Sequence, residues 1–308
     1  MKFIEIEKLL ENNTWQMETN SIEEFCKICR KKTKITTDFK KDGYKFIECS
    51  NCKIKTLQPF PSEKKLRNHY STRQKLGNYK QANAKFRISS LKQVFDKLRN
   101  EVVFSKNKKP SILDVGCFDG EFLDLAKKAG WQTYGIEYMT EPGQIAAKNH
   151  KIFIGRIEDF SSKNKYDIIT AIGLIEHLQQ PYHFFKFIQN HLDNNGICLI
   201  QTPNYESWIC KILGKKWFCY SAPEHTFYFS KSSLMNLMKS YGFQEANFFS
   251  HVKYLRCDYV YYQLQFWGKE IRKLISPLYN FLPTKIKSSV LPFYGGEMIY
   301  IFKKTRQE

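Results

Sequence analysis

The chain has 308 residues, 42% of them apolar, which is enough for one large domain with a sizeable core and a smaller domain beside it. No apolar run reaches the roughly 18 residues that a membrane-spanning helix needs. The first residues, MKFIEIEKLLENN, lack the basic and apolar regions of a secretory signal. Together with nine cysteines, this predicts a cytoplasmic protein with reduced thiols.

The net charge of +19 is concentrated in the first third of the chain. Residues 1–110 hold 26 lysines and arginines against 12 aspartates and glutamates. Such a surface favours an anionic partner: nucleic acid, a lipid surface or a phosphorylated substrate. A proteome generally rich in lysine would explain the same numbers, so charge alone does not choose a function.

Four cysteines near the start of the chain form two C-x-x-C pairs separated by nineteen residues: Cys26, Cys29, Cys49 and Cys52. This pattern is typical of a zinc ribbon, in which each pair turns two thiolates onto one metal ion. The segment between the pairs is predicted to be a hairpin with its turn at Asp42-Gly43. Four thiolates leave no open position for water. The sequence therefore predicts a structural zinc in an N-terminal segment, residues 1–60.

Residues 61–109 are predicted to form a helical linker. A proline-bounded extended piece leads to a helix that Ser62 caps, and a long basic helix follows from Lys85 to Phe104. Residues 106–109 then join this helix to the larger domain, residues 110–308.

The larger domain opens with ILDVGCFDGEFL, residues 112–123, which predicts a short strand, a glycine-containing turn and an amphipathic helix. This is the first unit of a doubly wound α/β sheet, whose ligands lie at the carboxyl ends of the strands. Gly116 and Gly120 allow a sharp turn and a close approach of the backbone to a ligand. The dinucleotide fingerprint does not fit, because Phe118 and Glu121 occupy its second and third glycine positions.

The same stretch resembles motif I of the class I S-adenosylmethionine-dependent methyltransferases, D-x-G-x-G-x-G. Asp114, Gly116 and Gly120 match the motif, and Phe118 departs from it. The resemblance implies that this loop, with Cys117, binds S-adenosylmethionine. It also implies a Rossmann-like sheet of seven strands that ends in an antiparallel hairpin, with residues 243–252 and 297–304 as its two strands.

Two further residues complete the predicted cofactor site. Glu137 ends the second strand, where this fold hydrogen-bonds ribose hydroxyls. In the family, an aspartate after the third strand reads the adenine edge. Arg156 stands there in this chain, so only the backbone of the next residue, Ile157, is carried over.

The fourth strand and the turn after it, Tyr166–Pro181, resemble the corresponding segment of the ubiquinone-pathway O-methyltransferases. Those enzymes have Glu-x-x-Glu-His at this point and use it for a divalent ion. Glu176 and His177 match, but Gly173 stands in place of the first carboxylate. We therefore expect no catalytic metal ion.

A hydroxyl acceptor requires a general base, and histidine suits that role near neutral pH. The segment around Pro223-Glu224-His225 also resembles the ubiquinone-pathway enzymes and precedes a helix predicted to close the substrate side. His225 is the preferred base, with Glu224 to orient its ring or stabilise the imidazolium. His177 is the second candidate. His183 lies on a helix predicted to face the core and is assigned a structural role.

Residues 253–296, between the last two strands, are predicted to be a helical insertion or lid. Its apolar residues fall at helical spacing, with lysines and arginines between them: Val260, Leu264, Trp267, Ile271 and Leu274. Such a helix either packs over the substrate site or lies on an anionic membrane surface.

The zinc ribbon and the proline-rich segment after it resemble the front of many bacterial methyltransferases of surface-sugar pathways. The first hypothesis is methyl transfer to a sugar hydroxyl or a related small, sometimes phosphorylated, precursor of surface polysaccharide. The alternative is a ribosomal-RNA base methyltransferase whose ribbon binds RNA. Against it, Gly173-Leu174-Ile175 replaces the Asn/Asp-Pro-Pro-Tyr/Phe motif for exocyclic amines. A third hypothesis is a cofactor-binding scaffold without catalysis.

Overall fold

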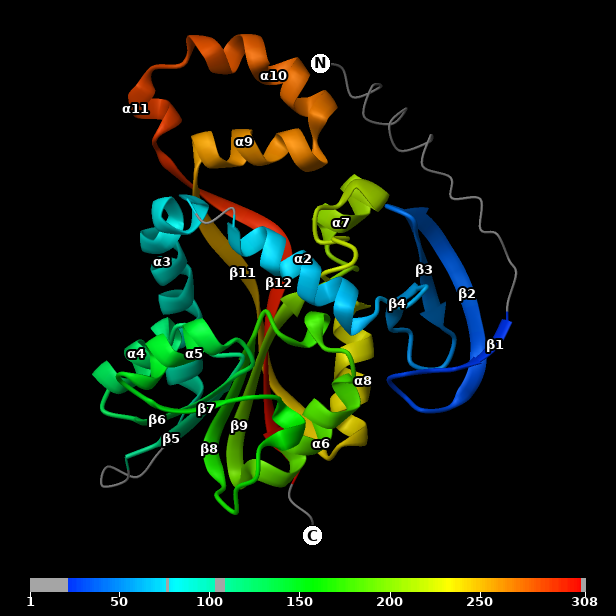
Figure 1. Ribbon diagram of the computed structural model, residues 1–308, viewed down its shortest axis with the longest axis vertical. Coiled ribbons are helices and arrows are strands. Elements are labelled where there is room, and N and C mark those ends of the chain that lie inside the picture. The colour runs from blue at the N-terminus through cyan, green and yellow to red at the C-terminus, as the bar shows by residue number, and fades with distance from the viewer. Residues whose placement is uncertain (1–21, 76–77, 103–108, 306–308) are drawn as a thin grey trace.

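The computed structural model describes residues 22–75, 78–102 and 109–305. Within these, the chain forms two sheets joined by two helices (Figure 1). The lead-in predicted for residues 1–20 and most of the junction predicted for residues 106–109 lie outside the described residues.

The larger sheet has seven strands in the order β7-β6-β5-β8-β9-β12-β11. The strands from β7 to β9 run parallel, and β12 is antiparallel to both of its neighbours. This confirms the predicted α/β doubly wound sheet with a final antiparallel hairpin. The strand bounds are β5 Ser111–Val115, β6 Gln132–Glu137, β7 Lys151–Ile154, β8 Tyr166–Ile172, β9 Leu192–Pro203, β11 Phe243–Arg256 and β12 Val290–Lys304.

Helices cover both faces of this sheet (Figure 1). Helices α3, α4 and α5 lie on one face and enclose one apolar core, whereas α6 and α8 pack on the other. Gly130 ends α4 with a φ of +84°, and Pro181 begins α6, as the sequence predicts. Their bounds are α3 Asn78–Glu101, α4 Glu121–Lys128, α5 Thr140–Ala147, α6 Pro181–His191, α7 Trp208–Leu213 and α8 Lys231–Ser240.

The smaller sheet contains the four cysteines at one end. Its order is β1-β2-β3-β4-β10, with bounds Ile22–Phe25, Lys32–Lys41, Tyr44–Cys49, Lys55–Gln58 and Phe227–Tyr228. The predicted hairpin is present, and Asp42 and Gly43 form its turn with positive φ angles. The fifth strand, β10, comes from the larger domain, and Lys41 Nζ donates to the Tyr220 carbonyl at 2.8 Å. The predicted boundary near residue 60 therefore does not separate two independent sheets.

The two linker helices differ in part from the prediction. Helix α2, Glu63–Lys75, begins after Ser62, whose Oγ accepts a hydrogen bond from the Lys65 amide at 3.3 Å. Helix α3 begins at Asn78 rather than Lys85 and ends at Glu101 rather than Phe104. No proline or glycine lies between residues 78 and 85, so nothing in the chain prevents the earlier start.

Between β11 and β12 the predicted single helix is two helices. Helix α9, Cys257–Trp267, ends at Gly268, and α10, Lys269–Phe281, follows; α11, Thr284–Lys287, leads into β12. Gly268 has φ −142° and ψ 43°, so the helical path is interrupted there. The apolar residues predicted to share one helix face therefore differ in exposure: Leu264 is 6% exposed, whereas Leu274 is 77% exposed.

Candidate functional site

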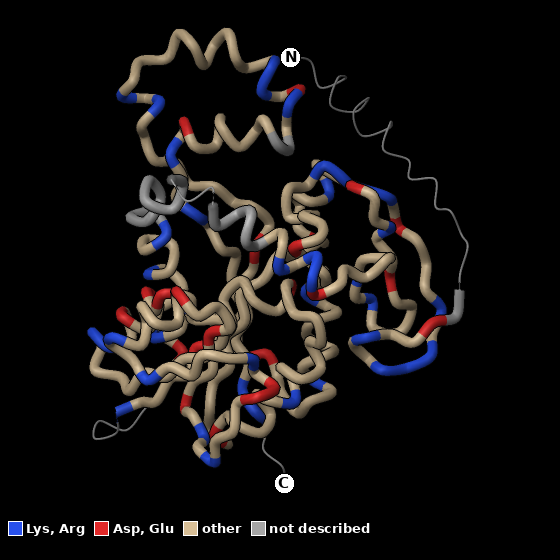
Figure 2. Tube along the Cα trace, viewed as in Figure 1, with Lys and Arg blue, Asp and Glu red and all other residues tan. Residues whose placement is uncertain are grey.

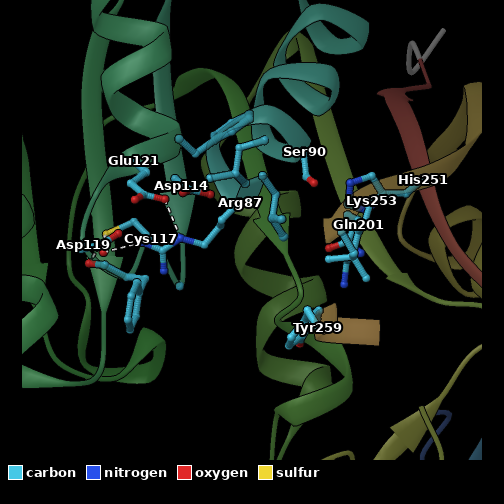
Figure 3. A pocket seen from close by; sticks show the side chains of 16 residues that line it. Arg87, Ser90, Asp114, Cys117, Asp119, Glu121, Gln201, His251, Lys253 and Tyr259 are labelled. Atoms are coloured by element: carbon cyan, nitrogen blue, oxygen red, sulfur yellow. Dashed lines mark hydrogen bonds and ion pairs between the residues drawn. The ribbon is translucent and has the colours of Figure 1, made fainter. Parts of the chain in front are cut away.

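A cavity of about 380 Å³ lies at the carboxyl ends of the central strands (Figure 3). The loop after β5 forms one wall, and residues of α3, β9, β11 and α9 form the others. The lining mixes apolar and charged side chains: Arg87, Ser90, Leu91, Asp114, Gly116, Cys117, Phe118, Asp119, Glu121, Phe122, Ile172, Gln201, His251, Lys253, Leu255 and Tyr259.

The loop after β5 turns through three residues with positive φ. Gly116 has φ +76°, and a Cβ there would lie 2.9 Å from Leu174 Cδ1; Gly120 has φ +87° and is equally close to His150. Phe118, which stands at a glycine position of the family motif, adopts φ +51°. The backbone thus makes the turn that glycine would favour, at a cost of about 1–2 kcal/mol for a residue with a side chain.

Two side chains, Asp114 near the end of β5 and Cys117 in the loop, are buried beside the cavity. The Asp114 carboxylate accepts a hydrogen bond from Thr170 Oγ1 at 2.6 Å. Burial raises the pKa of Asp114 to about 7, although the Thr170 hydrogen bond opposes the rise. Burial also raises the pKa of the Cys117 thiol, so this residue is neutral and contributes shape rather than charge.

The Glu137 carboxylate connects the ends of β5 and β6. It accepts the Phe118 amide at 2.9 Å and the Met139 amide at 2.7 Å, one on each oxygen. Burial raises its pKa and these hydrogen bonds oppose the rise. Each carboxylate oxygen retains a second lone pair, so Glu137 has the capacity to accept ligand hydroxyl groups as well.

Arg87, on α3, reaches toward Asp119 of the loop and Glu121 at the start of α4 (Figure 3). Its guanidinium contacts Asp119 Oδ2 at 2.8 Å and Glu121 Oε2 at 2.6 Å. The guanidinium carbon also lies 5.2 Å from the centre of the Phe118 ring. Helix α3 is therefore tied to the glycine loop by two ion pairs and a cation–π contact.

A polar network lies on the opposite side of the cavity, around the buried carboxylate of Glu297. Glu297 Oε2 accepts Gln201 Nε2 at 2.8 Å and lies 3.1 Å from His251 Nδ1, while Lys253 Nζ contacts Oε1 at 2.5 Å. Burial opposes ionisation, but the Lys253 ammonium and the His251 hydrogen bond outweigh it and lower the pKa of Glu297 to about 2. Glu297 is thus an anion across the physiological range.

The comparison with protein families decides the assignment. The family described as "Methyltransferase domain" matches residues 85–246, more than half of the chain, including the glycine loop and Glu137. The chain belongs to this methyltransferase family. It is a class I S-adenosylmethionine-dependent methyltransferase, as the glycine loop and the strand order predict.

Curated relatives of this methyltransferase include several named "Ubiquinone biosynthesis O-methyltransferase". The one from Histophilus somni is 27% identical over 135 residues, which cover 39% of this chain and 57% of the relative. The one from Rickettsia conorii is 26% identical over 150 residues, or 46% and 50% of the two chains. The methyltransferase thus spans about half the length of the curated relatives it matches.

Among solved structures, a methyltransferase from Thermotoga maritima titled "possible histamine N-methyltransferase" aligns with a TM-score of 0.49 and 18% identity. The alignment covers 75% of this chain and 96% of that chain.

The two preferred base candidates, His177 and His225, lie close together but outside the cavity lining. Their ring centres are 4.6 Å apart. His177 Nδ1 contacts the Glu224 carbonyl at 3.1 Å, and His225 Nδ1 contacts the Cys219 carbonyl at 2.8 Å. Burial and the neighbouring His177 lower the pKa of His225 to about 3. His225 is therefore neutral but a weak base near pH 7.

The predicted partners of these histidines have other contacts. The Cys219 carbonyl contacts Nδ1 of the His225 ring, and the negative charge of Glu224 acts to raise the pKa of His225. The Glu224 carboxylate also lies 3.7 Å from His69 of α2. His183 Nε2 lies 2.9 Å from the Gln180 side chain on the first turn of α6. Ile157 begins a single 3-10 turn after β7 and does not line the cavity.

Glu176, His177 and His225 together have the composition of a metal site. Glu176 is buried and accepts Thr202 Oγ1 at 2.9 Å. One potential ligand atom from each of the three residues lies within 4.8 Å of the other two. Because each ring uses Nδ1 as the donor to a carbonyl, the Nε2 atoms are the ligand candidates. His225 thus supplies a third potential metal ligand. The sequence comparison, in which Gly173 replaces the first carboxylate of the Glu-x-x-Glu-His motif, did not predict it.

The four cysteine sulfurs at the end of the small sheet also converge. Cys26 and Cys52 are 3.8 Å apart, Cys29 and Cys49 are 3.9 Å apart, and all four sulfurs lie within 4.8 Å of one another. In a tetrahedral site with zinc–sulfur bonds of about 2.3 Å, neighbouring sulfurs are about 3.8 Å apart. The donor set and its dimensions therefore fit a zinc ion.

The two cysteine turns are built alike. In each, the residue after the second cysteine has a positive φ, 55° at Arg30 and 59° at Lys53. The amide of that residue donates to the carbonyl of the first cysteine of its pair, at 3.0 Å and 2.9 Å. This shared conformation turns two sulfurs of each pair to the same side.

The sequence reasoning missed the network around Glu297. The two members farthest apart along the chain, Gln201 and Glu297, are separated by 96 residues. One signal was present: the two predicted hairpin strands place His251, near the end of one, opposite Glu297, at the start of the other, and the observed register pairs them. A carboxylate and a histidine that face each other across a hairpin mark a polar site.

Proposed function

We propose that this methyltransferase transfers a methyl group from S-adenosylmethionine to a hydroxyl group of a small molecule that carries an apolar part. One observation carries the proposal: a single cavity has the glycine loop on one side and the Glu297 network on the other. The loop supplies a donor site and the network supplies hydrogen-bonding groups for an acceptor.

The donor site is proposed from the sequence and supported by the geometry. Backbone at Gly116 and Gly120 would approach the cofactor, with Asp114 and Cys117 shaping the pocket. Glu137 would accept the ribose hydroxyls on its remaining lone pairs, and the backbone of Ile157 stays a proposed adenine contact. S-adenosylmethionine supplies a methyl group on a sulfonium whose sulfur is a good leaving group.

The apolar part of the acceptor is inferred from the cavity lining. Leu91, Phe122, Ile172, Leu255 and Tyr259 offer hydrocarbon or aromatic surface. The relatives' names, ubiquinone biosynthesis O-methyltransferase, agree with transfer to oxygen. The sugar hydroxyl of a surface-polysaccharide precursor and the ribosomal-RNA base remain narrower predictions, which the lining does not favour.

The ribbon is proposed to hold one structural zinc through Cys26, Cys29, Cys49 and Cys52. The four convergent sulfurs support it, and no atom of the four-cysteine set is left over for substrate. The division into residues 1–60, 61–109 and 110–308 is kept as a proposal about the chain's modules. The zinc would stabilise the ribbon, whose sheet includes β10 of the larger domain.

The experiment presents the purified protein with methyl-labelled S-adenosylmethionine and three acceptor pools: catechols with alkyl chains, nucleotide sugars, and total RNA. We expect label to enter the catechol pool, since it combines a hydroxyl with apolar surface. Label in the sugars or the RNA would contradict the proposed acceptor and support the corresponding alternative.

Two further measurements separate the donor and the metal questions. Calorimetry with S-adenosylhomocysteine should show binding, and no binding would reject the proposed function altogether. Transfer should persist in a chelator too weak to remove a four-thiolate zinc. Loss of transfer, restored by magnesium, would instead assign a catalytic ion to Glu176, His177 and His225.

A further inference from the structure

We infer that His251 is the general base of this transfer and that Glu297 positions it. The inference rests on the proposed function, because it assigns the proton acceptor for the hydroxyl in the same cavity. It replaces His225 and His177, which lie outside the cavity lining.

His251 and Glu297 face each other across the final hairpin. They are register partners of β11 and β12, and His251 Nδ1 lies 3.1 Å from Glu297 Oε2. Both side chains are buried, with 5% and 11% of their surface exposed. The hairpin therefore fixes the ring of His251 at the cavity.

The hydrogen bond to Glu297 sets which ring nitrogen carries the proton. An ionised carboxylate only accepts hydrogen bonds, so Nδ1 of His251 carries the hydrogen and Nε2 has the lone pair. Nε2 is buried and has no hydrogen-bond partner among the described residues. A buried acceptor left unsatisfied is destabilising, and a substrate hydroxyl would relieve this by donating to it.

Lys253 and Gln201 keep Glu297 in the ionised form that this tautomer requires. Lys253 Nζ contacts Oε1 at 2.5 Å, and Gln201 Nε2 donates to Oε2 at 2.8 Å. Glu297 would in turn stabilise the imidazolium that forms when His251 accepts a proton. The arrangement of base and carboxylate is the one that orients catalytic histidines in acyl-transfer enzymes.

The step balances without a further reactant. A lone pair of the acceptor hydroxyl forms the new oxygen–carbon bond to the methyl group. The carbon–sulfur bond breaks and its electron pair stays on sulfur, which becomes neutral. The hydroxyl proton moves to Nε2 of His251, and the resulting imidazolium returns it to solvent after product release.

The test compares His251→Gln, Glu297→Gln and a matched control, His191→Gln, whose ring lies on α6 and contacts the Phe187 carbonyl. Transfer is measured with the acceptor pool that takes label, and S-adenosylhomocysteine affinity by calorimetry. We expect His251→Gln to lose roughly 10²–10⁴ in turnover with unchanged affinity. Glu297→Gln should lose roughly ten- to a hundredfold, and His191→Gln nothing.

A spectroscopic measurement tests the positioning independently of the acceptor. With ¹⁵N-labelled histidine, His251 should show the Nδ1–H tautomer in the wild type and a mixture in Glu297→Gln. Near-normal turnover of His251→Gln, or an Nε2–H tautomer in the wild type, would overturn the inference. If S-adenosylhomocysteine fails to bind at all, the proposed function fails instead.

A separate observation concerns the outer surface of α10. Three apolar side chains spaced along one side of this helix are largely exposed: Leu274 at 77%, Leu278 at 71% and Phe281 at 88%. Helix α10 lies at the extremity of the molecule, beyond α9 (Figure 1). None of the described helices is long and apolar enough to cross a membrane.

The charge around this surface selects its partner. Helices α10 and α11 contain one acidic residue, Glu270. They contain five basic residues: Lys269, Arg272, Lys273, Lys285 and Lys287 (Figure 2). A second copy of the chain would bring like charges together. We propose that this α10 surface docks on an anionic lipid bilayer, with its apolar side chains entering the headgroup boundary.

The cavity is connected to the α10 surface by one continuous segment of the chain. Leu255 and Tyr259, at the junction of β11 and α9, line the cavity, and the same segment continues into α10. An acceptor with an apolar tail would reach the cavity from the membrane surface along this segment.

Vesicle sedimentation tests the docking. The protein should sediment with vesicles of equal phosphatidylcholine and phosphatidylglycerol, and much less with phosphatidylcholine alone. The double variant Leu274→Ser with Phe281→Ser should bind the anionic vesicles at least tenfold more weakly. The control Ile145→Ser, at an exposed position on α5, should bind them as the wild type does. Equal binding by the double variant would overturn the proposal. So would a dimer, detected by light scattering, that the double variant abolishes.

Discussion

The two sheets of this protein are stabilised in different ways. The seven-stranded sheet carries helices on both faces, and the core under α3 and α4 is built from that domain and its linker helix alone. The five-stranded sheet instead shares its cores with the larger domain: Ile35 and Ile47 join the core under α6 and α8. Its apolar side chains, such as Phe46 and Phe39, pack together with Trp217 and Tyr220 of the larger domain.

This difference shows how a small sheet is held when it cannot enclose a core. One end of the ribbon depends on the four cysteines, and its face depends on aromatic residues that follow β9. Strand β10 even completes its sheet. A module of about 40 residues buries a small fraction of its surface and usually needs a metal ion or a partner to be stable. The core under α3 and α4 contains no ribbon residue, so the two regions should respond unequally to the same kind of damage.

Removing the metal should produce the largest contrast. Cys49→Ser, or a strong chelator, should unfold the ribbon, because binding of a structural zinc contributes on the order of 10 kcal/mol to folding. Metal analysis should find about one equivalent of zinc in the wild type. S-adenosylhomocysteine binding should persist, since the glycine loop packs on the other core. Cys257→Ser, a half-buried cysteine outside the cluster, is the control. A wild type without zinc would remove the contrast.

Truncating the shared aromatic core should come next. Phe46 is fully buried and stacks on Phe39 with ring centres 4.3 Å apart. Phe46→Ala should lower the free energy of unfolding by about 3–5 kcal/mol. Phe25→Ala, at a position 60% exposed on β1, should change it by less than about 0.5 kcal/mol. Hydrogen exchange should rise at Trp217 and Tyr220 in the first variant, and exchange confined to the ribbon would argue for independent modules.

Acid should expose the role of Glu297 in the larger sheet. Its folded-state pKa of about 2 lies below the ordinary 4.5, so its contribution is complete above pH 4.5 and is lost as the pH falls through 2. The contribution is about 3 kcal/mol at neutral pH. Urea unfolding should show Glu297→Gln less stable at pH 6 and increasingly similar to wild type as the pH falls below 4.5. A gap that stays constant with pH would contradict the ion pair.

The smallest expected effect concerns the donor site. Glu137→Ala should weaken S-adenosylmethionine binding at least tenfold, or about 1.4 kcal/mol, because a carboxylate that accepts two hydroxyls makes charge-assisted contacts. The control is Asp193→Ala, at the amino-terminal end of β9, away from the cavity. Calorimetry should show no change in the S-adenosylmethionine affinity of this variant. Unchanged affinity in Glu137→Ala would remove this residue from the site.

The sequence itself determined those parts of the protein whose residues are close along the chain. The glycine loop, Glu137 at the end of the next strand and the C-x-x-C turns all depend on local backbone conformation and on hydrophobic periodicity. Such features are legible without coordinates because the residues that make them are covalently near. Motif I, including its departure at Phe118, was therefore found, and the family comparison agrees.

Only the tertiary structure decided which distant residues meet. The Glu297 network requires the antiparallel hairpin to bring residues 201, 251, 253 and 297 to one edge, and the ribbon acquires β10 from more than 160 residues away. His225 reaches Glu176 and His177 for the same reason. The difference in exposure across Gly268, with Leu264 of α9 buried and Leu274 of α10 exposed, depends on packing as well. Long-range contacts of this kind are set by how the elements stack, and one sequence read along its length carries only a weak signal of them.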